Sequence, residues 1–284
     1  MNGRARPRLF VCPTGVFAHL PLHAATTLEA SCTDFCVVSY TPTLTALLDA
    51  RRSFQPLPKH SAHVLLAVVS TPFEGTLLPE VVVESSVVVG IVPQQNLVQL
   101  GTGGQAIGDA TSDEVLRRLP GAPILHLACH GQQDSQEPLE SGFLMEDRRL
   151  TVSQLMALEL PSAFLAFLSA CDTAKGDTNQ PDQAIHLAAT MLYVGFKSVV
   201  GTMWRVPAAG GRLKRHRLIS SIYRSMNDAD GPVVAKTIYK ALYEGDAEYF
   251  DPEVIPYALD EAVSKLRRRR LHPTRWAPYV HIGI

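Results

Sequence analysis

The chain has 284 residues, and 46% of them are hydrophobic, which is enough to bury one large core or two modest ones. Its formal net charge of −1 excludes a global attraction to nucleic acid or to an anionic membrane, and no apolar run reaches the roughly 18 residues that span a bilayer. The five cysteines form an odd set without framework spacing, which favours a reduced, intracellular protein of the cytoplasm.

Strand-like runs recur along the chain, with helix-like segments between them. The predicted strands are residues 8–12, 35–40, 63–70, 97–100, 124–129, 164–170 and 198–203. The predicted helices are residues 43–52, 112–119, 152–158, 182–194, 232–244 and 255–270. The valine-rich run 79–92 is ambiguous, because its composition favours a strand and its place between two strands favours a crossover helix. The alternation predicts an α/β fold with a mostly parallel central sheet that helices cover on both faces.

Two of the predicted strands each end at a reactive side chain. The run 124–129 leads into His130 and Gly131, and the run 164–170 leads into Cys171. Open α/β sheets present their chemistry at the carboxyl ends of their strands. If these two strands are parallel neighbours, His130 and Cys171 meet at one edge of the sheet as a base and a nucleophile.

Cysteine-dependent hydrolysis needs a thiolate, a base that takes its proton, and N–H donors for the oxyanion. Cys171 and His130 can supply the first two, while the backbone N–H groups of Gly131 and Cys171 can form the oxyanion hole. The sequence shows no third residue that orients the histidine. From the residues alone, a buried inert cysteine and a satisfied loop histidine remain an equally weighted interpretation.

Three other patterns are better explained without a metal, a cofactor or a nuclear signal. The set of His126, Cys129 and His130 has a helical ligand spacing but lies on a predicted strand, where residues an odd number apart face opposite ways. The glycine-rich segment 101–106 lacks a convincing acidic partner for a dinucleotide and is better interpreted as a loop. The four arginines at 267–270 are typical of a solvated helix end rather than of a nuclear signal.

Further motifs occur in a fixed order along the chain. The segment around His130 is LHLACHG at 125–131, and the segment around Cys171 is LSACDTA at 168–174. The other segments are CPTG at 12–15, LPLHAA at 20–25, SYTPTL at 39–44, PDQAIHLAA at 181–189, VGTMW at 200–204 and WAPYVHIG at 276–283. Together and in this order they resemble the CHAT domain, a branch of the caspase-like cysteine peptidases related to separase, and most of all its fungal members. The resemblance covers nearly the whole chain and indicates one CHAT domain at 1–284.

The resemblance implies a caspase-like three-layer α/β sandwich. It implies His130 as the general base, Cys171 as the nucleophile, and Gly131 with the Cys171 N–H as oxyanion donors. Trp204 falls near the wall of the substrate cleft in related peptidases, although a core or lid tryptophan is an equal alternative. CHAT domains commonly follow helical tetratricopeptide-type repeats, so the resemblance implies such repeats or an upstream activator as partners, with this chain a fragment or a stand-alone effector.

The stretch 205–224 departs from the family pattern. It is very basic, and its excision would join Trp204 to Ser225 in an ordinary CHAT sequence. We interpret the stretch as a retained intron or a gene-model error rather than an evolved insertion, and transcript reads across the locus test this interpretation. If it is translated, it is expected to be a mobile basic loop at the rim of the cleft, able to gate substrate or bind an acidic partner.

The sequence therefore predicts a caspase-like cysteine endopeptidase that hydrolyses a protein or peptide substrate without a cofactor, and that binds neither nucleic acid nor a membrane. Asp177 and Asp182 are candidates for a pocket that takes a basic side chain, although a solvated loop and a helix start are the favoured alternative. The alternative function is a non-catalytic CHAT signalling or protein-interaction module that retains a relic dyad.

Overall fold

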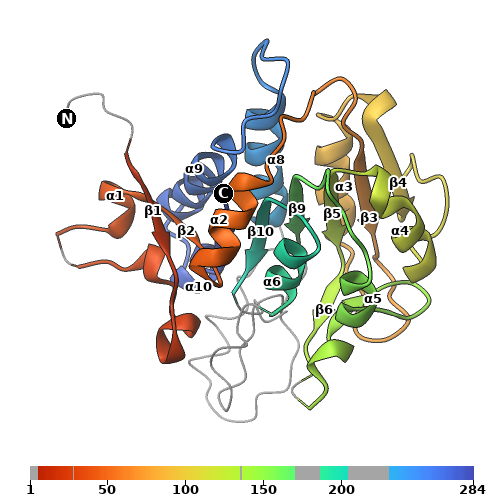
Figure 1. Cartoon of the computed structure of the whole chain (residues 1–284), viewed down its shortest axis with the longest axis horizontal. Helices are drawn as coiled ribbons and strands as arrows, with labels where there is room; N and C mark the ends of the chain where they lie inside the picture. The colour runs from red at the N-terminus through yellow and green to blue at the C-terminus, as the bar shows by residue number, and fades with distance from the viewer. Residues whose placement is uncertain (1–5, 28, 135, 170–185, 204–229) are drawn as a thin grey trace.

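The computed structural model describes residues 6–27, 29–134, 136–169, 186–203 and 230–284, and Figure 1 shows their arrangement around a central sheet. The order of the eight strands in this sheet is β1-β2-β11-β10-β9-β5-β3-β4. Their bounds are β1 Arg8–Val11, β2 Val37–Tyr40, β3 Val64–Val68, β4 Leu97–Gly101, β5 Ile124–Ala128, β9 Leu165–Leu168, β10 Ser198–Thr202 and β11 Tyr279–Gly283.

The strands form two parallel blocks that meet at one antiparallel pair. β1, β2 and β11 run in one direction, and β10, β9, β5, β3 and β4 run in the other. The antiparallel pair between them is β10 with β11. The prediction of a mostly parallel sheet is therefore confirmed, and the carboxyl ends of the larger block lie together at one edge.

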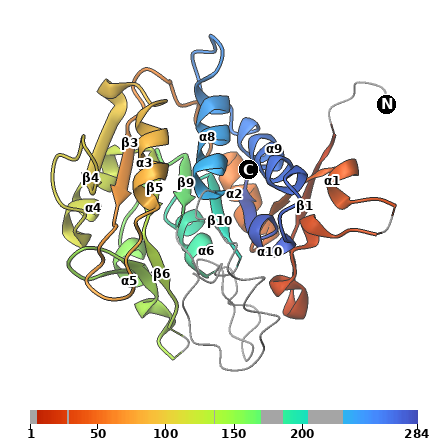
Figure 2. The same ribbon diagram turned by 180° about the vertical axis from the view of Figure 1, so that it is seen from behind.

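Helices cover both faces of the sheet. One face carries α2 (Leu44–Arg52), α4 (Ser112–Arg118), α5 (Val152–Met156) and α6 (His186–Tyr193), as Figure 1 shows. The other face, seen in Figure 2, carries α3 (Val81–Val89), α8 (Asp230–Tyr243), α9 (Val254–Arg268) and α10 (Pro273–Trp276). A separate hydrophobic cluster fills each interface between sheet and helices. Every residue of β3 and β5 is buried, as expected for central strands that helices cover on both sides.

The ambiguous run 79–92 forms a helix, α3, over most of its length. Val81, Glu84, Ser85 and Val88 are its buried residues, a spacing of three and four that places one helix face on the sheet. Helical periodicity of burial therefore outweighs the β propensity of the valines. Within the predicted helix 182–194, residues 186–193 form α6, and residues 182–185 lie outside the described part of the chain.

Two sets of strands were missed by the sequence interpretation. β6 (His130–Gln132), β7 (Gly142–Leu144) and β8 (Arg149–Thr151) form a small antiparallel sheet directly after β5. β11, close to the end of the sequence, inserts between β2 and β10. The strands of the small sheet have three residues each, too few to show an alternating hydrophobic pattern.

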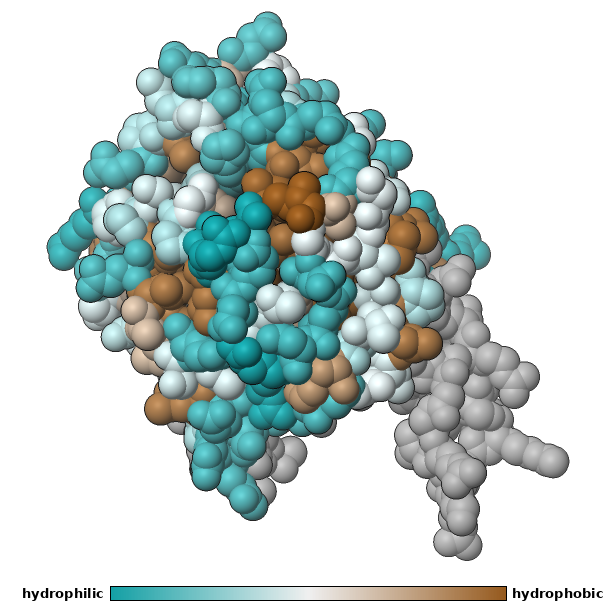
Figure 3. All heavy atoms as spheres, turned by 90° about the vertical axis from the view of Figure 1, so that its right-hand side faces the viewer, coloured by the Kyte–Doolittle hydropathy of each residue, from teal (hydrophilic) through white to brown (hydrophobic). Residues whose placement is uncertain are grey.

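The edge strand β4 is shielded by the loop that follows it. Gln99 accepts a hydrogen bond from the backbone N–H of Ile107 and forms an isolated parallel bridge with Ala106. Such a cover removes an edge that would otherwise pair with another chain. Figure 3 shows this side of the molecule, which is largely hydrophilic with hydrophobic side chains in separate patches. No helix in the described ranges is long and apolar enough to cross a membrane.

Candidate active site

The two strands that precede the predicted dyad are confirmed as parallel neighbours. β5 pairs with β9, and the last register pair is Leu127 with Leu168. His130 begins β6 two residues after β5 ends. Cys171 follows β9 in sequence but lies outside the described residues, as do Asp177, Asp182 and Trp204. The fold therefore brings together the strand ends from which the predicted base and nucleophile extend.

The imidazole of His130 is held by the loop that follows β3. The side chain is buried, and its Nε2 lies 2.8 Å from the main-chain oxygen of Thr76 and 3.2 Å from the Thr76 hydroxyl. A carbonyl oxygen can only accept, so Nε2 must carry the proton that it donates. In the neutral ring Nδ1 is then the nitrogen that can take up a proton. Thr76 is the orienting partner that the sequence did not reveal.

Gly75 gives this loop its shape. Its φ of +98° lies in a region that residues with a side chain rarely adopt. A Cβ built at Gly75 would lie 3.5 Å from Cδ2 of His130, so the backbone passes directly beside the imidazole. The glycine therefore positions the Thr76 carbonyl, and the carbonyl fixes the tautomer of His130.

His130 and Gly131 line a small cavity of about 390 Å³ together with Glu74, Gly75, Thr76, Gln132 and Leu144. The far wall is built by β7, in which Leu144 is the register partner of His130. Arg149 of β8 contacts two of the lining residues, since its guanidinium donates to Gln132 Oε1 at 2.8 Å and lies 3.4 Å from a Glu74 carboxylate oxygen. The predicted base and one predicted oxyanion donor thus share one concave, mostly polar site.

The described cysteines do not compete with Cys171 for this site. Cys129 is buried, Cys12 is exposed, and Cys32 and Cys36 are half-buried. Burial raises the pKa of the Cys32 thiol to about 11, which makes it a poor source of thiolate. None of these four residues lines the cavity of His130.

A buried polar network lies behind the site, on the face covered by α3 and α8. The Glu84 carboxylate accepts from the Ser169 hydroxyl at 2.6 Å and lies 3.1 Å from His126 Nε2. His126 Nδ1 lies 3.2 Å from the Tyr239 hydroxyl, and the ring stacks on Phe167 with centroids 4.5 Å apart. The network links β5, α3 and α8 to Ser169, which follows β9 and precedes Cys171 by two residues in the sequence.

The same network accounts for His126, which belonged to a weak metal pattern in the sequence. Its two ring nitrogens face Tyr239 and Glu84. No group of three or more potential metal-binding side chains occurs within the ranges that the structure describes. Gly231 also permits this arrangement, because a Cβ there would lie 2.8 Å from Glu84 Oε2. His126 is therefore part of the packing between the sheet and two helices.

Comparisons with known proteins agree with this architecture. The sequence profile of the CHAT domain matches residues 1–284. No curated protein sequence matches the chain significantly. A solved structure of the separase–securin complex of Saccharomyces cerevisiae is similar to it, with a TM-score of 0.61 and 12% identity over 97% of this chain. The similarity spans 15% of the length of that chain and concerns the fold, which is the expected caspase-like α/β sandwich.

Proposed function

Because the chain belongs to the CHAT domain family, we propose that it is a caspase-like cysteine endopeptidase with His130 and Cys171 as its catalytic dyad. The observation that carries the proposal is the position of the His130 imidazole against the Thr76 carbonyl. Its Nε2 is committed to the Thr76 carbonyl at 2.8 Å, which leaves Nδ1 as the basic nitrogen at the carboxyl end of β5. The neighbouring parallel strand β9, which precedes Cys171 in sequence, ends at the same edge of the sheet.

The reaction begins with the transfer of the Cys171 thiol proton to His130 Nδ1. The thiolate attacks the carbonyl carbon of the scissile peptide bond, and the carbonyl oxygen becomes an oxyanion that the N–H groups of Gly131 and Cys171 stabilise. Collapse of this intermediate breaks the C–N bond, and the leaving amine takes the proton from His130. Water then hydrolyses the thioester, with His130 accepting a proton from the water and the thiol receiving one back. No step needs a cofactor.

The hydrogen bond to Thr76 matters in each of these steps because the imidazole becomes a cation whenever it holds the transferred proton. The Thr76 carbonyl stabilises that cation through the Nε2–H bond and keeps the ring from rotating. Only 7% of His130 is exposed, so water is excluded and the hydrogen bond to the Thr76 carbonyl is strengthened. The surroundings of His130 thus suit a base that cycles between neutral and charged forms.

The direct test compares the purified full chain with its Cys171→Ala variant, each incubated with a proteome extract. We expect new protein N-termini with a shared sequence preference for the wild type, and none for the variant. His130→Gln should lose the same termini, while Cys12→Ala, which changes an exposed cysteine, should retain them. If the termini persist in Cys171→Ala, the dyad is not catalytic. Identical profiles without new termini would favour a signalling or protein-interaction module.

A further inference from the structure

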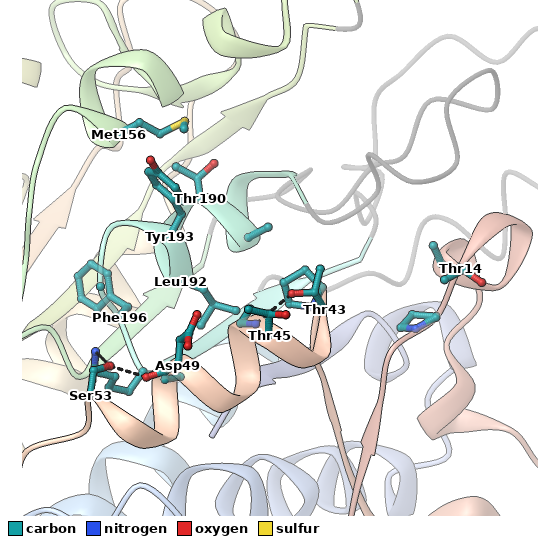
Figure 4. Close-up of a pocket in the computed structure, with 18 of the residues that line it drawn as sticks. Thr14, Thr43, Thr45, Asp49, Ser53, Met156, Thr190, Leu192, Tyr193 and Phe196 are labelled. Atoms are coloured by element: carbon teal, nitrogen blue, oxygen red, sulfur yellow. Dashed lines mark hydrogen bonds between the residues drawn. The ribbon is translucent and has the colours of Figure 1, made fainter.

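A second, larger cavity lies apart from the site of His130. It has a volume of about 950 Å³ and shares no lining residue with the cavity of His130. Figure 4 shows that α2 forms one side and α6 another, with Thr14 across the opening. Its size lies at the upper end of the roughly 300–1,000 Å³ range that is typical of small-molecule sites.

The walls of this cavity are mostly apolar. Ala46 and Ala50 of α2 face it from one side, and Leu192, Tyr193 and Phe196 face it from the other. Ala50 and Phe196 are buried, whereas Tyr193 is 70% exposed and stands at the rim. A ligand that fills the space would therefore bury mostly apolar surface.

Among the described residues, one cationic side chain lines this apolar space. Lys197, just before β10, is 7% exposed and lines the cavity. Within the same described ranges its ammonium donates one hydrogen bond, to the Ser53 hydroxyl at 2.9 Å, and that hydroxyl in turn donates to the Asp49 main-chain oxygen at 2.6 Å. In the described part of the chain no carboxylate pairs with Lys197 within 4.0 Å. Burial accordingly lowers the pKa of Lys197.

Burying an ammonium without a counter-ion is unfavourable unless something else compensates its charge. The α2 C-terminus contributes the Ser53 bond, which satisfies one of three N–H donors. An anion in the cavity would satisfy the others by charge-assisted hydrogen bonds. The exposed Asp49 carboxylate lines the same space and disfavours a ligand with two negative charges. The charges of the cavity therefore match a single negative group.

We propose that this cavity binds a monoanionic organic carboxylate with an apolar chain, whose carboxylate pairs with the Lys197 ammonium and whose chain lies between α2 and α6. This ligand class goes beyond the proposed peptidase reaction, because the cavity is separate from His130. The apolar chain contributes affinity by burial, and Lys197 contributes selectivity for the anion over neutral or cationic analogues.

The test measures binding of octanoate and decanoate, below their micelle concentrations, to the full chain by calorimetry and by thermal unfolding. Decanol and decylamine are the neutral and cationic analogues. We expect both carboxylates to raise the Tm in a concentration-dependent manner, with decanoate the tighter ligand, because a ligand that binds the folded state stabilises it. Decanol and decylamine should bind about tenfold more weakly or not at all.

Two variants with matched controls separate the site from general effects. Lys197→Met should lower the affinity for decanoate at least about tenfold, while Lys240→Met, on the exposed face of α8, should leave that affinity unchanged. Ala46→Phe should fill the cavity and abolish binding, while Leu48→Phe, which is 49% exposed on α2 and does not line the cavity, should leave it intact. Removing the buried charge should also leave the Tm of unliganded Lys197→Met at or above that of the wild type.

Four results would overturn the proposal. One is the absence of carboxylate binding by the wild type. A second is equal affinity for decanoate and decanol. The third is an unchanged affinity in a folded Ala46→Phe protein. A Lys197→Met protein that loses stability and binds decanoate as the wild type does would show that the ammonium serves only to cap α2. The proteolysis test with Cys171→Ala reads out a different site, so either proposal can fail without the other.

Discussion

The hydroxyl of Ser169 donates a 2.6 Å hydrogen bond to the carboxylate of Glu84, a residue 85 positions earlier in the chain. Ser169 directly follows β9 and precedes Cys171 by two residues, while Glu84 lies in the buried face of α3. The other oxygen of the same carboxylate lies 3.1 Å from His126 in β5. One buried acid therefore links the middle of β5 to the residue that directly follows β9.

Glu84→Gln tests the contribution of this acid to stability. The amide keeps the size of the side chain but replaces one acceptor oxygen with a donor, so the buried hydrogen bonds to Ser169 and His126 must be rearranged. We expect a loss of about 1–3 kcal/mol in the free energy of unfolding, measured by urea denaturation. Glu248→Gln, at an exposed position, should change it by less than about 0.5 kcal/mol. Equal effects of the two substitutions would contradict the role assigned to Glu84.

Gly75→Ala tests how His130 is oriented. At a φ of +98° the new Cβ introduces backbone strain, and the Thr76 carbonyl shifts away from Nε2. We expect kcat/KM for a cleaved peptide to fall about tenfold to a hundredfold, with the pH dependence of Cys171 alkylation altered in parallel. The alkylation readout does not depend on finding a substrate.

Two controls accompany Gly75→Ala. Thr76→Val removes the hydroxyl at 3.2 Å but keeps the main-chain oxygen at 2.8 Å, so its activity should stay within a few-fold of the wild type. Gly121→Ala adds a methyl group where nothing lies within 4 Å and should have no effect. A larger loss in Thr76→Val than in Gly75→Ala would show that the hydroxyl, rather than the carbonyl, holds the imidazole.

The sequence predicted the central strands because their apolar runs are continuous. Residues 124–129 and 164–170 contain β5 and β9, and their parallel pairing at one edge follows from the α/β pattern. It could not predict Thr76 as the partner of His130, since a main-chain carbonyl has no sequence signal and the two residues are 54 positions apart. Gly75 lies in the loop that follows β3, and the positive φ that explains its role is not visible in the sequence.

Because His23 is buried, we expect the folded protein to lose stability in acid. Burial lowers the pKa of His23 to about 4, whereas an unfolded histidine titrates near 6.5. Between these values the unfolded state binds a proton that the folded state does not. The contribution of neutral His23 is therefore complete above about pH 6.5 and is lost as the pH falls toward 4, at up to about 1.4 kcal/mol per pH unit.

Urea unfolding at pH 7.5, 6 and 5 measures this effect. The pKa of His281 is also lowered well below its ordinary value by burial, so it adds to the slope of the wild type. His23→Gln should show a shallower decline between pH 6.5 and 5 than the wild type, whatever its stability at pH 7.5. Replacing His60, which is exposed, should leave the slope unchanged. Parallel curves for wild type and His23→Gln would mean that His23 can be protonated without loss of packing.

Asp230→Asn tests the buried ion pair that joins the first turn of α8 to α10. The Arg275 guanidinium donates from Nε and Nη2 to the two carboxylate oxygens of Asp230, both at 2.7 Å, and each residue is 7% exposed. The substitution removes a buried carboxylate charge and weakens the two charge-assisted hydrogen bonds that Asp230 accepts from Arg275, so we expect a loss of about 3–5 kcal/mol in urea unfolding. Glu261→Gln, in the exposed pair with Lys265, should cost at most about 0.5 kcal/mol.

The double variant Asp230→Asn, Arg275→Gln separates the two sources of that loss. If most of it comes from the guanidinium left without its carboxylate, removing the charge as well should restore part of the stability. If the loss instead reflects the missing contact between α8 and α10, the double variant should be no more stable than Asp230→Asn. Recovery in the double variant would therefore assign the cost of Asp230→Asn to charge burial rather than to the anchoring of α8.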